Sequence, residues 1–268
     1  MTIVLPTKAE KAHTINPRVL FIFSQTKVWK TELALSLENN LVIDLESWSS
    51  YYDWMRFDVR EYALQNDMSI KEAFAELIKS LKESKKNWHQ YEYITIDTAT
   101  ALEDIALELA LELYKASPTW KNFSWTSVIN LPNWSWYWWL REAFEKIYMQ
   151  IKLLPSKCII LLWHVKNSSI LKDWEEISVR DINLTWKQKF IVCADSDAIW
   201  YMYRNPKNPK QNLIEFGTDQ TTTVSWSRAK HLANTQFVIS EIIDWSLVTY
   251  RDKIFIKESI NDITQNEG

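Results

Sequence analysis

Glycine is nearly absent from this chain, and its scarcity limits the turns that the backbone can make. The 268 residues contain two glycines, Gly217 and Gly268, beside 16 tryptophans. At an average usage of about 7 %, a chain of this length would contain roughly 19 glycines. Turns and helix ends often need a positive φ, which glycine adopts without steric cost and a bulky residue does not. The two residue counts look exchanged.

The tryptophans stand where turn glycines are usual. Trp54, Trp174 and Trp245 each follow aspartate, and Trp88 and Trp134 each follow asparagine. Asp-Gly and Asn-Gly are among the strongest short turn signals. Eleven of the 16 tryptophans follow Asp, Asn, Ser or Thr, which is loop chemistry. We hypothesise that UGA codons, which encode glycine in some genetic codes and tryptophan in others, were translated as tryptophan. The alternative is a genuinely tryptophan-rich protein.

Composition narrows the functional classes. A net charge of −3 gives no global basic field, so any nucleic-acid contact must come from a local patch. The two cysteines and four histidines form no cluster with zinc spacing. The N-terminus lacks the apolar stretch of a signal peptide, and the strongest apolar run, 158–163, is too short to span a bilayer. We therefore expect a cytoplasmic protein that does not contact a membrane.

Apolar runs alternate with segments of helical periodicity along most of the chain, which predicts a parallel sheet with helical crossovers. The predicted strands are 18–23, 41–46, 91–97, 157–162, 188–194 and 198–204, and the predicted helices are 31–38, 70–86, 101–115 and 137–153. Long polar loops are expected at 116–136 and 166–186, and antiparallel strands at 213–257. The predicted organisation is a flexible segment 1–17, a core 18–212 and a C-terminal extension 213–268.

A candidate phosphate-binding loop connects the first predicted strand to the first predicted helix. Its residues are Ser24, Gln25, Thr26, Lys27, Val28, Trp29, Lys30 and Thr31. This is the context in which the Walker A pattern GxxxxGK[ST] is meaningful, because loop N–H groups and the helix N-terminus hold phosphates there. Lys30 would reach the β- and γ-phosphates of ATP, and Thr31 would hold Mg²⁺ through its hydroxyl.

Two positions depart from that pattern. Ser24 replaces the first glycine, and its side chain is small enough to be tolerated. Trp29 replaces the second glycine, where the backbone must approach phosphate closely and an indole would obstruct the site. Either residue 29 is glycine in the native protein or the nucleotide site is inactive.

Polar residues end three of the predicted strands. Asp97 ends an apolar strand, as the Walker B carboxylate near the metal does. Glu46 ends the strand 41–46 and is a candidate for orienting the attacking water. His164 follows the strand 157–162 and is a candidate sensor of the γ-phosphate, although a lone histidine is more often structural.

The order of these segments resembles the bacterial RecA recombinase core, and more closely the compact RecA-like ATPases that phages encode for single-strand annealing and recombination. The matching segments are the phosphate loop, VIDLE (42–46), ITIDTATAL (94–102) and the strand before His164, within residues 18–205. The resemblance implies an α/β, RecA-like P-loop NTPase core with a mainly parallel sheet, helices on both faces and a C-terminal antiparallel extension. It also implies hydrolysis of ATP with Mg²⁺ on Thr31 and Asp97, and catalytic roles for Lys30, Glu46, Asp97 and His164.

The resemblance further implies partners. In such proteins two loops, matching 116–136 and 166–186 here, hold single-stranded DNA, and Lys166, Lys172 and Arg180 are the candidate contacts. Related enzymes assemble into rings or filaments with nucleotide between subunits, so Arg228 and Lys230 are candidates for basic fingers acting on a neighbour. A single-strand binding protein is a further expected partner.

Two other readings stay open from the sequence. If every tryptophan is authentic, the cluster of Trp125, Trp134, Trp136, Trp138 and Trp139 in and beside the first long loop fits a non-catalytic binding module that stacks bases or sugars. The third interpretation is another RecA-like motor, such as a helicase or a clock-type ATPase. We expect Trp139 to be authentic in every case, because it begins a helix whose buried face suits an aromatic residue. The codons at positions 29, 48, 54 and 245 discriminate between the first two readings.

Overall fold

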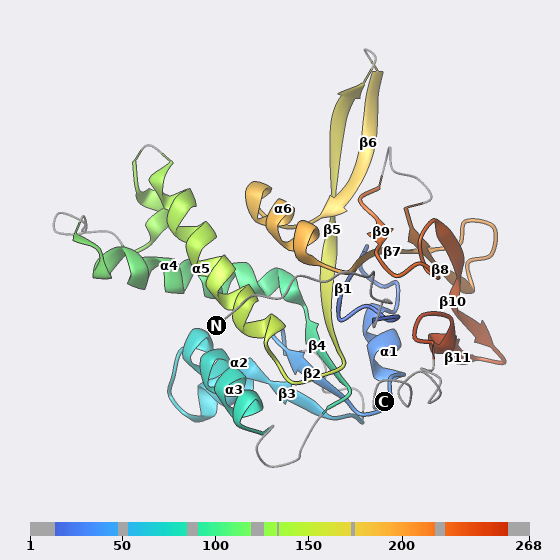
Figure 1. Ribbon diagram of the computed structural model, residues 1–268, viewed down its shortest axis with the longest axis horizontal. Helices are drawn as coiled ribbons and strands as arrows, with labels where there is room; N and C mark the ends of the chain where they lie inside the picture. The colour runs from blue at the N-terminus through green and yellow to red at the C-terminus, as the bar shows by residue number, and fades with distance from the viewer. Residues whose placement is uncertain are drawn as a thin grey trace, which may run out of the picture.

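One sheet organises the chain in the computed structural model (Figure 1), which describes residues 14–47, 53–84, 91–118, 126–132, 134–172, 175–217 and 223–256. Its strands are β1 (Val19–Ser24), β2 (Asn40–Asp44), β3 (Arg56–Asp58), β4 (Tyr93–Asp97), β5 (Cys158–Lys172), β6 (Glu175–Ile182), β7 (Ala198–Arg204), β8 (Gln211–Phe216), β9 (Trp226–Ser227), β10 (Thr235–Ile243) and β11 (Ser246–Thr249). They lie in the order β11-β10-β8-β7-β1-β5-β4-β2-β3, with β6 beside β5 and β9 beside β7.

The sheet has a parallel centre and an antiparallel flank. Strands β7, β1, β5, β4, β2 and β3 pair in parallel, whereas β8, β10 and β11 add to β7 in antiparallel pairs. This arrangement confirms the predicted α/β class with a C-terminal antiparallel extension. The predicted boundary between residues 212 and 213 falls inside β8.

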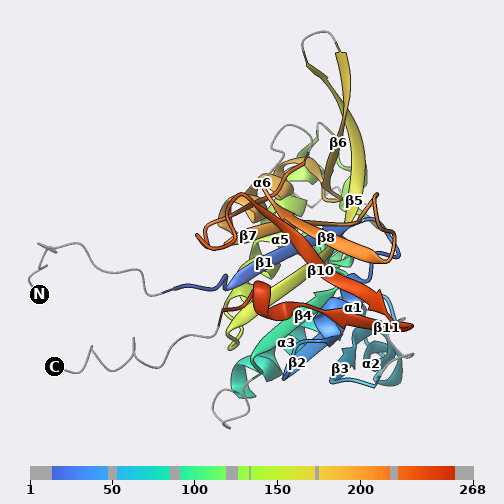
Figure 2. The same cartoon turned by 90° about the vertical axis from the view of Figure 1, so that its right-hand side faces the viewer.

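Helices cover both faces of the sheet (Figures 1 and 2). They are α1 (Lys30–Leu35), α2 (Val59–Gln65), α3 (Ile70–Ser84), α4 (Leu102–Ala116), α5 (Ser135–Lys152) and α6 (Trp186–Asp195). Side chains of β1 alternate between two cores, since Phe21 and Phe23 pack with residues of α2 to α6 and Leu20 and Ile22 pack with residues of α1. Period-2 alternation in a strand buried on both faces produces this division.

The prediction of a polar loop at 166–186 is wrong. Strand β5 does not stop at residue 162 but continues to Lys172, and β6 returns beside it as an antiparallel hairpin that projects beyond the sheet (Figure 2). The polar residues Asn167, Ser168 and Ser169 suggested a loop, yet a two-stranded hairpin exposed to solvent has no core that requires apolar residues.

The strand predicted near 188–194 is also wrong, because these residues belong to α6. Gln188 and Val192 are buried while Phe190 is 61 % exposed, which is helical spacing and not strand alternation. The apolar run Phe190–Cys193 concealed that period. Within the described residues, no helix is long and apolar enough to cross a membrane.

Candidate active site

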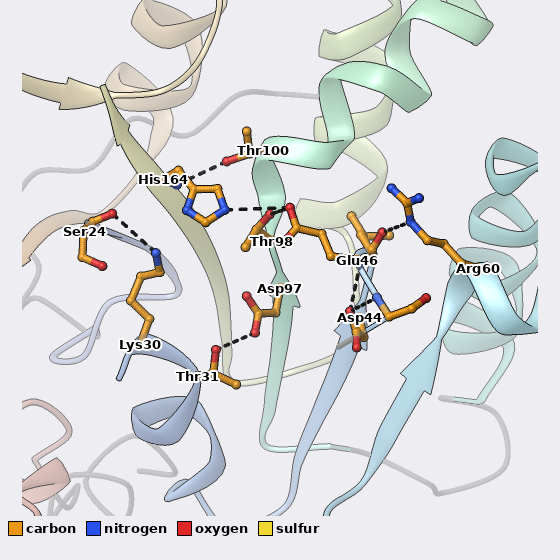
Figure 3. Close-up of polar contacts among 12 residues, drawn as sticks. Ser24, Lys30, Thr31, Asp44, Glu46, Arg60, Asp97, Thr98, Thr100 and His164 are labelled. Atoms are coloured by element: carbon orange, nitrogen blue, oxygen red, sulfur yellow. Dashed lines mark hydrogen bonds and ion pairs between the residues drawn. The ribbon is translucent and has the colours of Figure 1, made fainter. Parts of the chain in front are cut away.

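The ends of the parallel strands bring distant residues to one edge of the sheet. Ser24 at the end of β1 lies in register with His164 of β5, and Asp97 at the end of β4 lies in register with Asp44 of β2. Parallel strands that start on one side must all finish on the other, where open α/β sheets bind their ligands. The predicted site residues gather at this edge (Figure 3).

Residues 25–29 connect β1 to α1 and line a cavity of about 430 Å³. The cavity wall also includes Lys30, Thr31, Glu46, Asp97 and His164. All five residues predicted as catalytic or metal-binding from the sequence therefore face one space. Ser24 does not line it. This residue is fully buried as the last residue of β1, and its carbonyl oxygen lies 3.5 Å from the Lys30 ammonium.

Lys30 is buried beneath the loop, with 7 % of its surface exposed. Burial lowers the pKa of its ammonium from 10.5 to about 8, and the nearby carboxylates of Asp97 and Glu46 partly oppose this shift. A buried cation interacts strongly with anions, because little water competes for it. Lys30 is thus placed and charged to hold phosphate oxygens.

Thr31 and Asp97 meet although 66 positions separate them. Thr31 Oγ1 donates a 2.8 Å hydrogen bond to Asp97 Oδ2. The other oxygen, Asp97 Oδ1, is buried and has no hydrogen-bond partner among the described residues. Burial raises the pKa of this carboxyl to about 6, and the Thr31 hydrogen bond and Lys30 oppose the rise.

These two residues fit a magnesium ion that arrives with nucleotide. The described residues contain no group of three or more His, Cys, Asp or Glu that could hold a metal ion by themselves. Mg²⁺ is usually bound by one or two protein oxygens together with waters and substrate phosphates. A threonine hydroxyl beside a carboxylate oxygen without a partner is a donor set of that kind.

Glu46 lies beyond its predicted strand. Strand β2 ends at Asp44, and Glu46 follows in a bend. Its Oε1 accepts a 2.8 Å hydrogen bond from Thr98 Oγ1 and lies 3.8 Å from His164 Nε2. The interaction with His164 contributes most to lowering the pKa of Glu46, and Thr98 and Arg60 act in the same direction. Glu46 is therefore ionised at neutral pH and faces the cavity as an acceptor.

The backbone that carries Glu46 is held by residues that the sequence analysis did not identify. Asp44 Oδ1 accepts hydrogen bonds from the N–H groups of Glu46 and Ser47, at 2.9 and 2.8 Å. Arg60 Nε donates to the carbonyl oxygen of Leu45 at 2.6 Å. Asp44 precedes the predicted site residue Glu46 by two positions, so its acidic side chain could have marked it in the sequence as a second site residue. Arg60 comes from α2, a helix that the periodicity analysis missed.

His164 marks the point where β5 leaves the sheet. Its N–H donates to Thr100 Oγ1 at 3.2 Å, and its carbonyl oxygen accepts from the N–H of Asn183 at 2.9 Å. The hairpin register begins at the next residue, where Val165 pairs with Ile182. His164 thus contacts Glu46 on one side and begins the hairpin on the other.

The predicted finger residues lie away from the cavity of their own chain. Arg228 Nη2 donates to the carbonyl oxygen of Ala194 at 2.8 Å, and Nη1 lies 3.8 Å from Asp197. Lys230 is exposed. Neither residue lines the nucleotide cavity.

The predicted DNA contacts all belong to the hairpin. Lys166 lies opposite Asp181, and Lys172, whose side chain is outside the described residues, has Glu175 as its register partner. Asp181 is also paired with Lys189. The Arg180 guanidinium carbon lies over the ring of Tyr201, 5.4 Å from its centroid.

The chain is similar to a solved recombinase structure and to one family of AAA domains. A solved structure described as the RadB recombinase has 11 % sequence identity and a TM-score of 0.42, covering 88 % of this chain and 92 % of that one. No curated protein matches the chain. A protein-family model described as an AAA domain matches residues 16–231. That span contains the phosphate loop, both strand-end carboxylates and His164, and the chain belongs to this family of P-loop domains.

Proposed function

We propose that the protein binds and hydrolyses ATP and uses this reaction to act on single-stranded DNA in recombination, annealing or repair. One observation carries the proposal: the phosphate loop, the Thr31–Asp97 pair and Glu46 line a single cavity. Each group has the chemistry that phosphoryl transfer requires, which is cationic and metal stabilisation of phosphate charge and an acceptor for the attacking water.

Each residue that lines the nucleotide cavity is proposed to have a separate role, according to its position. Lys30 and the loop N–H groups hold the phosphates, and Thr31 and Asp97 hold the Mg²⁺ that neutralises phosphate charge. Glu46 accepts a hydrogen bond from the attacking water and orients it. Thr98 and His164 fix the Glu46 carboxylate, so the acceptor is held in place before the reaction.

Residue 29 decides whether this site can work, and we propose that it is glycine in the native protein. Trp29 has φ 53° and ψ 36°, the left-handed conformation, at the start of α1. A bulky residue is strained there by about 1–3 kcal/mol, whereas glycine is not. Trp29 is one of the residues that line the nucleotide cavity, and the Arg204 guanidinium carbon lies 5.4 Å from the centroid of its ring.

The backbone conformation and burial of the other tryptophans support a native glycine at some positions and oppose it at others. Trp134 and Trp245 also have positive φ, 60° and 66°, and are 78 % and 99 % exposed. Trp163 and Trp200, in contrast, are fully buried in β5 and β7. We therefore propose glycine at 29, 134 and 245. Trp139 packs edge-on against Tyr114, in agreement with an authentic aromatic residue. Positions 48, 88 and 174 lie outside the described residues.

Two experiments test the proposal. Purified protein with Trp29→Gly should hydrolyse ATP faster with single-stranded DNA than without it, and Lys30→Ala in the same background should abolish the activity. If the glycine form shows neither hydrolysis nor ATP-dependent DNA binding, the proposed function is wrong. Mass spectrometry of the protein from its native source, or the codons at 29 and 245, tests the exchange directly.

The resemblance to compact phage RecA-like ATPases extends the proposal to assembly. We infer a ring or filament in which Arg228 and Lys230 reach the nucleotide of a neighbouring copy, a cytoplasmic location and cooperation with a single-strand binding protein. An Arg228→Ala form that retained full DNA-stimulated hydrolysis would remove Arg228 from that role. An unwinding assay separates this function from that of a helicase.

A second candidate function keeps every tryptophan. Trp134 and Trp136 stack at 6.4 Å between ring centroids at the start of α5, and Trp138 is 58 % exposed. Aromatic faces of this kind stack on bases or sugars. On this reading the chain is a P-loop scaffold that binds without hydrolysis, and tight ATP binding by the protein with Trp29 would exclude it.

A further inference from the structure

A second cavity, of about 650 Å³, lies against the phosphate loop. It shares Gln25, Thr26, Lys27 and Val28 with the nucleotide cavity. The rest of its wall comes from β6, β7, β8 and β10 and their connections, and does not include Glu46, Asp97 or His164. The phosphate loop is therefore a partition between two spaces, and the function proposed above uses one of them.

Three cationic side chains line this second cavity, beside a single carboxylate, Glu215. Lys27, Arg180 and Arg204 line it, and none of the three forms an ion pair within the described residues. Arg204 Nη2 donates to the carbonyl oxygen of Lys27 at 3.1 Å, which aligns it with the loop. The Arg180 guanidinium lies over the ring of Tyr201. Positive groups that share a concave surface favour an anionic ligand.

An aromatic surface lies beside these cations. Tyr201 and Tyr203 stack with ring centroids 5.1 Å apart and an angle of 15° between the rings. Tyr201 is buried, whereas Tyr203 is partly exposed at the cavity wall, with its hydroxyl held by Gln236. Glu215 also lines the cavity; it is buried, and its Oε1 accepts a 3.5 Å hydrogen bond from Ser225 Oγ. A carboxylate is the acceptor that suits an exocyclic amine on a base edge.

We propose that this second cavity binds a nucleotide unit of single-stranded DNA at the base of the hairpin. Phosphate contacts Arg180 and Lys27, the base packs on Tyr203, and Glu215 accepts from the base edge. Cations that track phosphates, together with an aromatic platform, are the usual basis of single-strand binding. The inference rests on the proposed function and names where its DNA lies: the strand and the ATP phosphates contact opposite sides of residues 25–28.

The test measures binding of a fluorescein-labelled oligodeoxycytidylate, whose bases carry the exocyclic amine, by anisotropy over a range of salt concentrations. Arg180→Gln should weaken binding about three- to tenfold at low salt and reduce the salt slope by about 0.7, the value for one phosphate contact on a single strand. Arg180→Lys should keep the slope because it keeps the charge. Tyr203→Ala should weaken binding about tenfold with the salt slope unchanged, because stacking does not release counterions.

The matched control is Lys79→Gln, which removes one exposed charge from α3, an element that contributes nothing to either cavity. It should bind the oligonucleotide as the parent does. Each protein is measured both with Trp29 and with Trp29→Gly, since Arg204 contacts the Trp29 ring.

Two results would overturn the inference. If Arg180→Gln and Tyr203→Ala bind the oligonucleotide as Lys79→Gln does, or if the parent does not bind it, the cavity is not a DNA site. If these variants weaken binding of a fluorescent ATP analogue instead, the cavity takes the base of the ATP. ATP hydrolysis by the Trp29→Gly protein is scored separately. If the parent binds the oligonucleotide and the cavity variants bind it equally well, the cavity assignment is lost and the proposed function stands. If the parent does not bind it, the DNA part of the proposed function is lost as well, and loss of hydrolysis alone does not alter the oligonucleotide result.

Discussion

Thr31 Oγ1 binds one oxygen of the Asp97 carboxylate at 2.8 Å and leaves the other oxygen buried without a partner among the described residues. The pair joins the start of α1 to the end of β4, so it couples the phosphate loop to the centre of the sheet. A buried carboxylate oxygen without a partner is costly unless a ligand supplies the missing charge.

The Asp97 carboxyl makes the nucleotide-free protein less stable at neutral pH. Its pKa is about 6 in the folded protein and near 3.8 in the unfolded chain, so the folded protein binds the proton more tightly. Stability contributed by this group is therefore present below about pH 4 and decreases as the pH rises through 6. Asp97→Asn should stabilise the nucleotide-free protein at pH 7.5 by on the order of 1–3 kcal/mol.

The measurement is chemical denaturation of both proteins at pH 7.5 and pH 5. The advantage of Asp97→Asn should shrink at pH 5, where the native carboxyl is protonated, and the variant should have lost Mg²⁺-dependent hydrolysis. Equal stability of the two proteins at pH 7.5 would contradict the burial argument.

Removing the Thr31 hydroxyl should impair metal use without disrupting packing. In the Trp29→Gly background, Thr31→Val keeps the shape of the side chain and should raise the Mg²⁺ concentration needed for half-maximal hydrolysis by about tenfold or more, since each ligand contributes on the order of 1–3 kcal/mol. Thr31→Ser retains the hydroxyl and serves as the control. An unchanged Mg²⁺ requirement in Thr31→Val would show that the hydroxyl is not a ligand.

Glu46→Gln should separate ATP binding from hydrolysis. The amide lacks the charge that accepts a proton, and loss of such a group lowers turnover by about 10²–10⁴-fold. ATP affinity should change little, because the Glu46 carboxylate contacts Thr98 and His164 rather than the phosphate loop. A filter-binding measurement beside single-turnover hydrolysis distinguishes the two effects, and a parallel fall in both would assign Glu46 to binding.

Asp44 should act as a positioning residue for Glu46. Asp44→Asn keeps an oxygen that can accept from the N–H groups of Glu46 and Ser47, whereas Asp44→Ala removes it. We expect Asp44→Ala to lower kcat about tenfold or more with KM for ATP little changed, since each lost hydrogen bond costs on the order of 1 kcal/mol. Asp44→Asn should recover most of the rate. If KM rises and kcat does not fall, Asp44 supports binding rather than catalysis.

Replacing tryptophans of positive φ by glycine should stabilise the protein at two separate places. Trp29→Gly and Trp245→Gly each relieve a left-handed backbone, and each should gain about 1–3 kcal/mol in the free energy of unfolding. Because Trp245 lies at an exposed turn between β10 and β11, its replacement should leave ATP affinity unchanged, whereas Trp29→Gly should increase it. Destabilisation by both changes would indicate authentic tryptophans.

The sequence was sufficient to predict the sheet and the residues that line the nucleotide cavity. It was not sufficient to predict the local backbone geometry around those residues. Lys30, Thr31 and Asp97 could be identified because a buried strand, a loop and a helix follow one another in a fixed order. The sequence identifies Glu46 as a site residue but predicts that the strand continues through it. The apolar run gives no sign that the Asp44 side chain accepts a hydrogen bond from the N–H group of Glu46 and so ends the strand. Such a turn depends on side-chain hydrogen bonds that periodicity does not record.

Two other features depend on tertiary contacts. The hairpin of β5 and β6 is polar because most of its surface meets solvent, so its sequence resembles a loop. The cavity beside Tyr203 unites residues from 25 to 236, and no local pattern indicates that Arg180 and Arg204 face the same space.

The continuity of β5 has a mechanical consequence. The strand runs without interruption from Cys158, inside the sheet, to Lys172 at the tip of the hairpin, and His164 lies at the point of emergence. The eight residues beyond His164 span about 26 Å at ~3.3 Å per residue. A tilt of about 5° at that point moves the tip by about 2 Å. Because His164 Nε2 lies 3.8 Å from Glu46 Oε1, a rotation of the strand at this point would displace the tip far more than it would displace the atoms beside the nucleotide cavity.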